Sequence, residues 1–472
     1  MNRRKFFRNG ALLTTGTALL NPFEIVAGNT HKPVISAWKK AKNIIMLVSD
    51  GMSMGTLTMA DIYLQRQTGT GSNWLNLYRE NKVSRGVMDM ASASSIVTDS
   101  AAASSSWGSG YRVKNGALNI GVNGEDYLPI WQKFKKAGKM AGCVTTVPIT
   151  HATPAGFCVS SKSRNSQAEI AEKYLDINFD VMMGGGQQYF DPTQRKDKKD
   201  LYAAFSKKGY QVVKTRSEML AAPTNKPLLG VFFEDGLPYS IDRKNIKDQS
   251  NAVPTLAEMT SKAIEKMKQH PNGFVLQVEA GKVDWAAHAN CIGGLLFDQI
   301  AFDEAVQVAM DFAEKDANTL VIITTDHGNA NPGLVYGKKA DDNFDNLNKF
   351  KHTNEWILNG ITSNSTVSQI KERIEFANGF ILENEEAQTL LMYYKGLEKG
   401  DDGLYNYKKL PYKTFAEMQY SRTSVGWNST DHSADFTEIA MFGPGSENHK
   451  PFIKNTDLHY FMLAVAEVEN KF

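Results

Sequence analysis

Two parts of the sequence place carboxylate and imidazole groups where they could bind a metal ion together. In the segment 279–288, Asp284 and His288 are four residues apart. If this segment is helical, both side chains lie on one face and can bind one ion; the alternative is a solvated helix face. Asp326 and His327 follow a strongly apolar run. Such a pair at a strand end can also bind metal, and a capped turn is its alternative.

A candidate nucleophile, Ser100, lies in the segment 97–103, which has the sequence VTDSAAA. A helix that begins near Ser100 would direct free backbone N–H groups and the positive end of its dipole toward an anion, which suits phosphate. The alternative is that Thr98, Asp99 or Ser100 only caps this helix. From these residues alone both interpretations stay open.

A second serine, Ser53, competes for the role of nucleophile. The segment 51–55 fits the pattern G-x-S-x-G and follows a strand-like run, as the nucleophile of an α/β-hydrolase esterase would. This interpretation leaves Glu279, the Asp284/His288 pair and Asp326 without a role. The short pattern is also weakly specific, so the sequence favours Ser100.

Four short apolar runs would deliver polar side chains to one place. Each run ends just before a residue that could bind metal or act on substrate, and continuous apolar runs are typical of parallel strands buried on both faces. The pairs are Asn43–Ser49 before Asp50, Ala141–Val147 before His151, Phe274–Val278 before Glu279, and Thr319–Thr325 before Asp326. Open α/β sheets bind ligands beyond the carboxyl ends of their strands, so we expect a site at this edge.

Helical patterns between these runs complete an α/β order. They cover Ile130–Lys136, Leu256–Lys268 and Phe297–Glu314, and their alternation with strands predicts a doubly wound sheet. From about residue 331 to 422 the alternation is interrupted, which predicts an insertion on the main domain. A strand over Thr437–Phe442 and a helix from about Asp457 to Glu469 return to the core.

Composition is ordinary for a globular protein. The chain has 472 residues, 42% of them hydrophobic, and a formal net charge of +2, which gives no indication of a nucleic-acid partner. Its three cysteines are Cys143, Cys158 and Cys291. They cannot all pair and form no CxxC motif, so we expect buried, unpaired thiols.

The first 28 residues have the pattern of a signal peptide. Arg3 and Arg4 precede an apolar stretch, Ala11–Leu20, which is too short to span a bilayer. The adjacent arginines followed by Phe6 and Phe7 favour a twin-arginine signal over an ordinary secretory one. We therefore expect a periplasmic or secreted protein, with the mature domain over 29–472 and no membrane span after removal of the signal.

Taken together, these segments resemble the alkaline phosphatase family over nearly the whole chain after the signal. The matching segments, in chain order, are Val48–Met52, Val97–Ala102, Tyr111–Gly116, His151–Pro154, Gln277–Asn290, Thr325–His327 and Thr430–His432. Their joint order and spacing are highly specific. By itself His432 is typical of a turn, and Thr153 of an ordinary loop. The resemblance implies a three-layer α/β/α sandwich with a mostly parallel sheet, a crown-like insertion, and a homodimer.

The resemblance also implies two zinc ions, one magnesium ion and a role for each site residue. One zinc would be bound by Asp284, His288 and His432. The other would be bound by Asp50, Ser100, Asp326 and His327. Magnesium would be bound by Asp50, Thr153 and Glu279. Arg164 stands where the family keeps its phosphate-binding arginine, and Asp99 where it keeps the carboxylate that orients this arginine.

The chemistry of phosphate esters explains why the site would need these ions and residues. A phosphate monoester brings two negative charges to a nucleophile that is itself best ionised, so cations must dominate the site. Imidazoles favour zinc and oxygen ligands favour magnesium, while an arginine can hold two phosphoryl oxygens. We therefore expect a phosphomonoesterase that forms a phosphoserine on Ser100. A related metal-dependent phosphodiesterase or sulfatase, and a silent metal- or phosphate-binding protein, are the alternatives.

Two residues depart from one well-known bacterial version of the family. That version carries Asp and Lys where this sequence has His151 and Trp285, although other members carry histidine at the first position. The resemblance places both residues around the magnesium site. Metal selectivity and phosphate affinity are therefore the properties that we expect to differ.

Overall fold

The computed structural model describes residues 39–400 and 403–471. Its centre is a ten-stranded sheet in the order β14-β2-β13-β8-β1-β7-β3-β4-β6-β5. The bounds, in that order, are Phe452–Lys454, Ser84–Asp89, Thr437–Phe442, Thr319–Thr324, Asn43–Ser49, Phe274–Ala280, Met140–Pro148, Val181–Gly185, Leu228–Val231 and Gln211–Val213. Neighbouring strands are parallel except where β13 meets β2 and β8.

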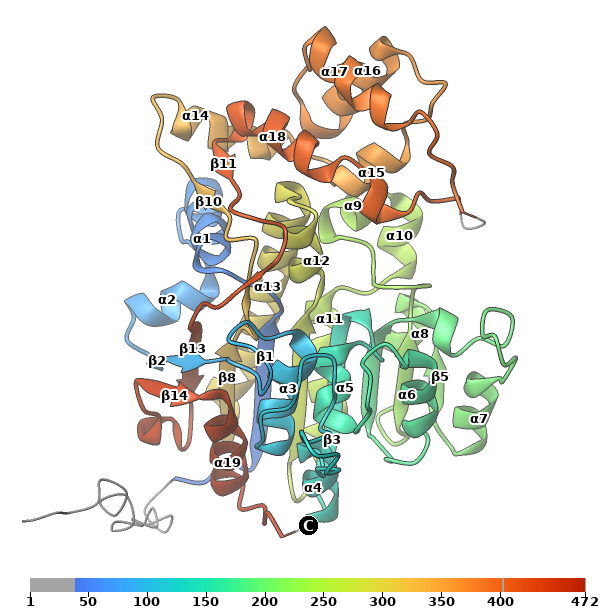
Figure 1. Cartoon of the computed structure of the whole chain (residues 1–472). Helices are drawn as coiled ribbons and strands as arrows, with labels where there is room; N and C mark the ends of the chain where they lie inside the picture. The colour runs from blue at the N-terminus through green and yellow to red at the C-terminus, as the bar shows by residue number, and fades with distance from the viewer. Residues whose placement is uncertain (1–38, 401–402, 472) are drawn as a thin grey trace, which may run out of the picture. The chain divides into compact units, whose positions relative to one another are not determined.

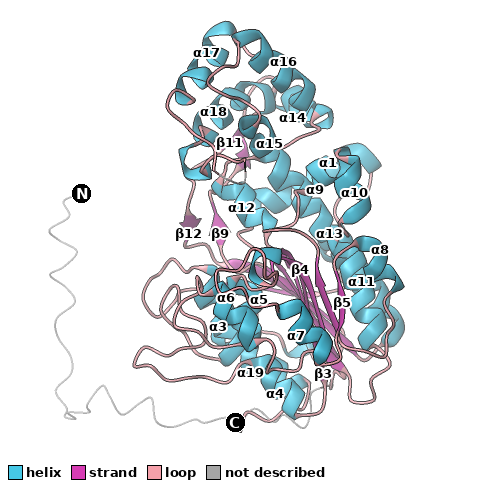
Figure 2. Cartoon of the chain, turned by 90° about the vertical axis from the view of Figure 1, so that its right-hand side faces the viewer, coloured by secondary structure: helices cyan, strands magenta, loops and turns pink. Residues whose placement is uncertain are grey.

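Helices cover both faces of this sheet (Figure 2). Helices α11 (Leu256–Met267) and α13 (Ile292–Asp316) pack on β1, β3, β7 and β8 from one side. On the other side, α4 (Ile130–Lys136) and α5 (Ala152–Cys158) contact the sheet, and α3 (Ser100–Ser109) packs against α5 and α19 (Asn455–Val465). The predicted three-layer α/β/α fold is confirmed.

The remaining helices and small strands lie around these layers (Figure 1). The helices are α1 (Met54–Thr68), α2 (Asn73–Arg79), α6 (Gln167–Lys173), α7 (Leu201–Lys207), α8 (Arg216–Ala221), α9 (Ser240–Asn245), α10 (Lys247–Ala252), α12 (Lys282–His288), α14 (Ala340–Asp345), α15 (Asn354–Asn359), α16 (Val367–Asn378), α17 (Asn384–Tyr393) and α18 (Tyr412–Thr423). The small strands are β9 (Gly328–Asn329), β10 (Gly333–Leu334), β11 (Val425–Gly426) and β12 (His432–Ser433).

The central strands β1, β3, β7 and β8 match the four apolar runs of the sequence to within two residues at each end. Their side chains are buried on both faces, which is why alternation is absent from these runs. Strand β7 extends to Ala280, so Glu279 lies inside the strand rather than after it. Helix α13 is longer than expected, because it begins at Ile292 rather than Phe297.

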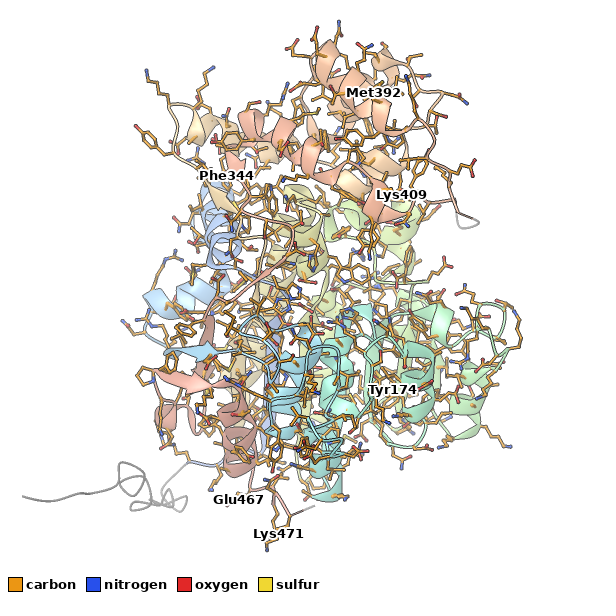
Figure 3. The ribbon with its side chains drawn as sticks, viewed as in Figure 1. Tyr174, Phe344, Met392, Lys409, Glu467 and Lys471 are labelled. Carbon is orange, nitrogen blue, oxygen red and sulfur yellow. The ribbon has the colours of Figure 1, made fainter. Side chains whose placement is uncertain are left out.

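The segment 331–422 contains helices α14 to α17 and all but the last residue of α18. Its first part joins the main apolar core through Phe344, Leu347 and Phe350, and Figure 3 labels Phe344 where this segment meets the main layers. The later helices form a separate apolar cluster that includes Ile357 and Phe415. Figure 1 shows these helices stacked beyond one end of the sheet strands.

Two expectations concern the termini and the thiols. The proposed signal, residues 1–28, lies outside the described residues. In the described part of the chain, no helix is both long enough and apolar enough to cross a membrane. Cys143, Cys158 and Cys291 are all buried and unpaired, which confirms the interpretation of these residues as small core side chains.

Candidate metal centre and active site

The carboxyl ends of the four central strands bring the predicted residues together. Strand β1 lies between β7 and β8, with Val48 opposite both Glu279 and Thr324. Strand β3 follows on the other side of β7, with Thr145 opposite Glu279. Asp50 and Asp326 therefore emerge from adjacent strands, and Glu279 lies beside them. All three carboxylates have no exposed surface.

The first cluster contains Asp284, His288 and His432. The Nε2 atoms of the two histidines are 3.1 Å apart, and each lies 3.5 Å from an Asp284 carboxylate oxygen. Helix α12 confirms the expected helical spacing of Asp284 and His288. Nδ1 of His288 donates to the Thr430 carbonyl (2.6 Å) and Nδ1 of His432 to the Thr98 carbonyl (3.0 Å). These bonds leave both Nε2 lone pairs free for one ion.

The second cluster surrounds the candidate nucleophile. Oγ of Ser100 lies 3.2 Å from Nε2 of His327. The same nitrogen lies 3.3 Å from Oδ2 of Asp326 and 3.6 Å from Oδ1 of Asp50. The imidazole rings of His327 and His432 stack with their centroids 3.7 Å apart, so the first and second clusters adjoin.

A third cluster lies on the other side of Asp50. Oγ1 of Thr153 donates to Oδ2 of Asp50 at 3.2 Å, and Oγ1 of Thr145 donates to Oε2 of Glu279. A ring nitrogen of His151 and carboxylate oxygens of Asp50 and Glu279 all lie within 4.8 Å of one another. His151 is therefore close enough to be a direct ligand and not only a neighbour of the site. No sequence pattern pointed to a role for Thr145, because it lies inside strand β3.

These clusters contain buried polar atoms that the described residues leave without hydrogen-bond partners. They are Oδ1 of Asp50, Oε1 of Glu279, Oδ2 of Asp326, and Nδ1 of both His151 and His327. Burial raises the pKa of Glu279 to about 7 and that of Asp326 to about 6, and burial together with Asp326 raises the pKa of Asp50. Unpaired buried carboxylates are costly unless cations compensate them. This donor set therefore fits metal ions.

A candidate anion site adjoins the second cluster. Ser100 is the first residue of α3, and Asp99 caps this helix by accepting from the Ala102 N–H (2.9 Å). The other oxygen of Asp99 accepts from Nη1 of Arg164 (3.1 Å) and from the Gly116 N–H (2.9 Å). Nη2 of Arg164 lies 3.1 Å from Nε2 of His151. The expected helix start at Ser100 is thus confirmed, Asp99 caps the helix, and the same carboxylate holds Arg164.

The competing serine has different surroundings. Oγ of Ser53 lies 2.6 Å from Oδ1 of Asn331 and 3.1 Å from the carbonyl of Asn329, and it accepts from the Asn329 N–H. Among the described residues its hydrogen-bond partners are all asparagine groups, which cannot act as a general base. The geometry therefore gives no support to an esterase that uses Ser53.

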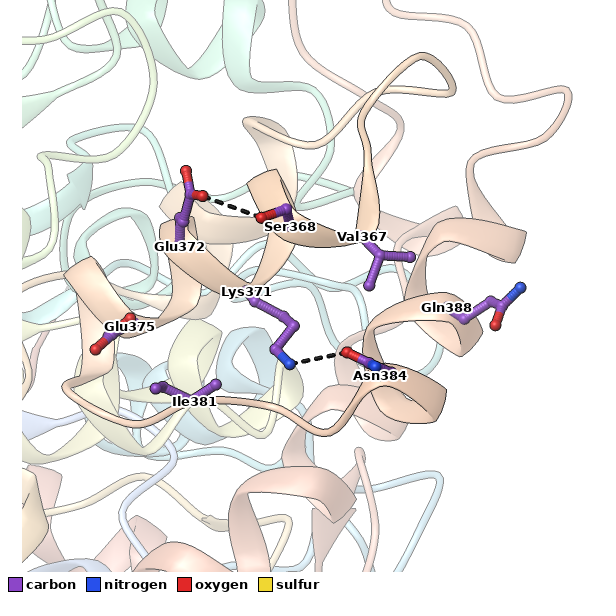
Figure 4. Close-up of a pocket in the computed structure, with 8 residues that line it drawn as sticks. All are labelled: Val367, Ser368, Lys371, Glu372, Glu375, Ile381, Asn384 and Gln388. Atoms are coloured by element: carbon purple, nitrogen blue, oxygen red, sulfur yellow. Dashed lines mark hydrogen bonds between the residues drawn. The ribbon is translucent and has the colours of Figure 1, made fainter.

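A hollow of about 610 Å³ lies between helices α16 and α17 (Figure 4). Its lining includes Val367, Lys371, Ile381 and Asn384. Lys371 donates across it to Asn384 at 2.9 Å. It contains none of the candidate site residues, and its open, mixed lining gives no indication of a substrate.

The sequence of the chain matches known proteins. The family model described as "Alkaline phosphatase" matches residues 41–468. The chain belongs to the alkaline phosphatase family. Alkaline phosphatase 4 of Bacillus subtilis (strain 168) is 30% identical over 430 residues, covering 88% of this chain and 87% of the relative. Alkaline phosphatase of Escherichia coli (strain K12) is 33% identical over 351 residues, 64% of this chain and 73% of the relative.

A solved structure agrees as well. Thermus thermophilus alkaline phosphatase superposes with a TM-score of 0.84 at 32% identity, covering 91% of this chain and 92% of that chain. As an alkaline phosphatase family member the chain is a metal-dependent phosphomonoesterase, and the predicted family, enzyme class and fold are confirmed. The residues grouped above are candidates for its metal ligands.

Proposed function

We propose that this alkaline phosphatase family member hydrolyses phosphate monoesters through a phosphoserine on Ser100. One observation carries the proposal: Oγ of Ser100 lies at the start of α3, 3.2 Å from His327, beside the buried Asp50 and Asp326. The hydroxyl loses its proton and attacks phosphorus, the bond from phosphorus to the alcohol oxygen breaks, and this oxygen takes up a proton and leaves as the alcohol. Water then cleaves the phosphoserine, which restores the hydroxyl and releases inorganic phosphate.

Three ions would be held by three sets of residues. We assign one zinc ion to Asp284, His288 and His432, a second to Asp50, Asp326, His327 and Ser100, and magnesium to Asp50, Thr153 and Glu279. Bound there, the ions would lower the pKa of the Ser100 hydroxyl and of the attacking water and compensate the phosphate charge. The imidazoles suit zinc, and the carboxylate and hydroxyl oxygens suit magnesium.

Arg164 would bind two phosphoryl oxygens. Its guanidinium is held at Nη1 by Asp99 and at Nη2 by His151, so it is oriented before substrate arrives. The proposed contacts of Arg164 are to the phosphoryl group and not to the leaving group. We therefore expect broad specificity among monoesters, with His151 and Trp285 modulating the magnesium site and the affinity for phosphate.

The resemblance also motivates proposals for the location and the oligomeric state of the protein. We propose export to the periplasm or beyond, by way of a signal in residues 1–28, and a catalytic domain over 29–472 with an insertion at about 331–422. We also propose a homodimer. Exposed apolar side chains favour an interface, and they include Met54, Val335, Tyr336, Tyr420 and Phe436.

The test is a rate comparison on purified mature protein. It should be assayed with zinc and magnesium on a monoester and on a diester of one chromogenic leaving group, with bound metals counted in parallel. We expect the monoester to be hydrolysed far faster. Preference for the diester would favour a phosphodiesterase, and no turnover of either by metal-loaded protein would favour a silent binding protein.

A further inference from the structure

A buried lysine beside the site has no role in the chemistry above. Lys282 is the first residue of helix α12, two residues before Asp284, and only 4% of it is exposed. Its ammonium group forms no hydrogen bond or ion pair with another described residue. A buried ammonium group is costly without compensation, so its surroundings should show what it does.

Aromatic rings surround this ammonium group. Nζ of Lys282 lies 3.7 Å from the ring centroid of Tyr239 and 4.6 Å from that of Trp285. Both distances are well inside the range of cation–π attraction, which is strongest in desolvated places. Two carboxylates lie nearby, the buried Asp298 and the exposed Asp235. Burial raises the pKa of Asp298, and the positive charge of Lys282 opposes this shift. The charge therefore lies near two rings and two acids.

The indole of Trp285 is also confined by the backbone at Gly236. A Cβ atom added to Gly236 would lie 2.9 Å from Cζ3 of Trp285 and 3.3 Å from Cδ of Lys282. Only glycine at this position leaves room for both side chains. Gly236 and Lys282 together therefore fix where the indole lies.

Trp285 in turn contacts His151. Their rings meet edge to face, with centroids 6.0 Å apart and planes at 78°, an arrangement that favours one orientation of each ring. His151 contacts Nη2 of Arg164 at 3.1 Å. Packed contacts thus connect Tyr239, Lys282, Trp285, His151 and Arg164 without a gap.

We infer that Lys282 is a positioning residue for Arg164, which it reaches through Trp285 and His151. Its cation attracts the indole, the indole fixes the imidazole, and the imidazole supports one side of the guanidinium while Asp99 supports the other. This inference rests on the proposed role of Arg164 in phosphate binding. It adds that the orientation of this arginine depends on the charge of Lys282 in helix α12, although Lys282 does not contact the substrate.

The first test compares Lys282→Met with wild-type enzyme, both loaded with zinc and magnesium. Methionine keeps the length and the apolar stem and removes the charge. The dissociation constant of inorganic phosphate, measured by calorimetry, should rise roughly five- to tenfold, with bound metals unchanged and KM affected more than kcat. Lys282→Arg should restore most of the affinity. Equal phosphate affinity in Lys282→Met and wild type would overturn the inference.

A double-mutant cycle separates positioning from a direct effect of the charge on phosphate. In an Arg164→Ala background, Lys282→Met should weaken phosphate binding no further, because the group that it positions is gone. The same loss in both backgrounds would overturn the inference. Tyr239→Leu keeps the lysine charge and removes one ring, and it should show a smaller loss of the same kind. This variant also serves if Lys282→Met fails to fold.

Lys262→Met is the matched control. Lys262 is equally buried but lies on α11, where it pairs with Glu265 at 3.1 Å, so its loss should leave phosphate affinity unchanged. A similar loss in this variant would reduce the Lys282 effect to general destabilisation and overturn the inference. The proposed function is judged separately, by turnover of the wild type, since phosphate affinity is measured without turnover.

Discussion

Buried polar groups behave differently at the sheet edge and in the helical segment 331–422. At the edge, buried oxygens of Asp50, Glu279 and Asp326 have no partner among the described residues. In the helical segment, the amide of Gln419 donates to Asn354 at 2.9 Å and to Asn378 at 3.0 Å, and Asn354 donates back at 3.1 Å. All three of these amides are buried.

The difference separates a site whose buried acids suit cations from a polar core whose amides bond to one another. A satisfied network makes packing unique and rigid. Unsatisfied buried acids lower stability, and a protein retains them where a ligand compensates them. Substitutions in the two regions should therefore have opposite signatures: lost chemistry at the sheet edge, and lost stability with intact chemistry in the helical segment.

The largest effect should follow Ser100→Ala. Loss of the nucleophile should lower kcat/KM on a monoester by about 10³-fold, with the fold and the bound metals retained. Acid quenching with labelled substrate should trap labelled phosphate on the wild type only. Ser53→Ala is the control, and it should remain active. A labelled Ser100→Ala protein would show that another residue accepts the phosphoryl group.

The next effect compares two arginines. Arg164→Ala should weaken phosphate binding by about 2–4 kcal/mol, because it removes a charge-assisted, bidentate contact. Arg373→Ala belongs to the helical segment, where Arg373 lies 3.7 Å from the centroid of the Trp356 ring and bonds to the Ile357 carbonyl. It should lower the melting temperature and leave the phosphate inhibition constant unchanged. Equal phosphate affinities for the two variants would contradict the proposed role of Arg164 in phosphate binding.

The third prediction concerns pH and metal removal. Burial raises the pKa of Glu279 to about 7 and of Asp326 to about 6, so the folded metal-free protein keeps protons that the unfolded chain has released. Its stability should therefore fall as pH rises from about 4 to about 7, by about 3 kcal/mol for each of the two carboxyl groups. Bound cations replace these protons. Melting curves at pH 5 and pH 8, with and without chelator, should show the larger decrease in the metal-free protein.

Other buried acids also contribute to the decrease in stability with pH, and their contribution does not depend on metal. Burial raises the pKa of Asp298 to about 7 and of Asp303 to about 6, and both lie outside the clusters. They should affect metal-free and metal-loaded protein alike, so the difference between the two pH profiles is the quantity to measure. Identical profiles would mean that the carboxylates at the sheet edge do not bind cations.

The smallest effect should follow Gln419→Ala. Buried amides of Asn354 and Asn378 would each lose a partner, at a cost of about 1–3 kcal/mol in the free energy of unfolding measured in urea. Turnover of metal-loaded enzyme should stay unchanged. Gln388→Ala, at an exposed position on α17, is the matched control and should be close to neutral. Loss of activity in Gln419→Ala would break the proposed separation between the two regions.

The same contrast explains what the sequence could predict. The strands β1 and β13 and the helix α4 have the predicted bounds, because burial on both faces leaves a clear apolar run and helix α4 has a clear period. Strands β4, β5 and β6 were not predicted, since they are short and lie toward one edge of the sheet. In the helical segment, short helices depend on local caps such as that of Thr366 with Gln369, which hydrophobic patterns do not show.

At the candidate site, spacing predicted Asp284 with His288, and strand ends predicted Asp50 and Asp326. Arg164 could be identified only by resemblance, because a lone arginine in a loop carries no signal of its partners. Lys282 and Tyr239 were not predicted at all. Their contact depends on a ring and an ammonium group meeting across 43 positions of the chain, which no local pattern encodes. The roles of these residues as ligands and nucleophile stay predictions.

The separation between His288 and His432 has a consequence for the order of assembly. Their Nε2 atoms meet across 144 positions of the chain, and the backbone carbonyls that orient them belong to Thr430 and Thr98. A nascent chain on the ribosome could complete the proposed ligand set only after His432 has left the exit tunnel. Earlier segments can offer an ion at most part of its shell. With the proposed ligands, metal loading would be a late event that closes long loops of the chain.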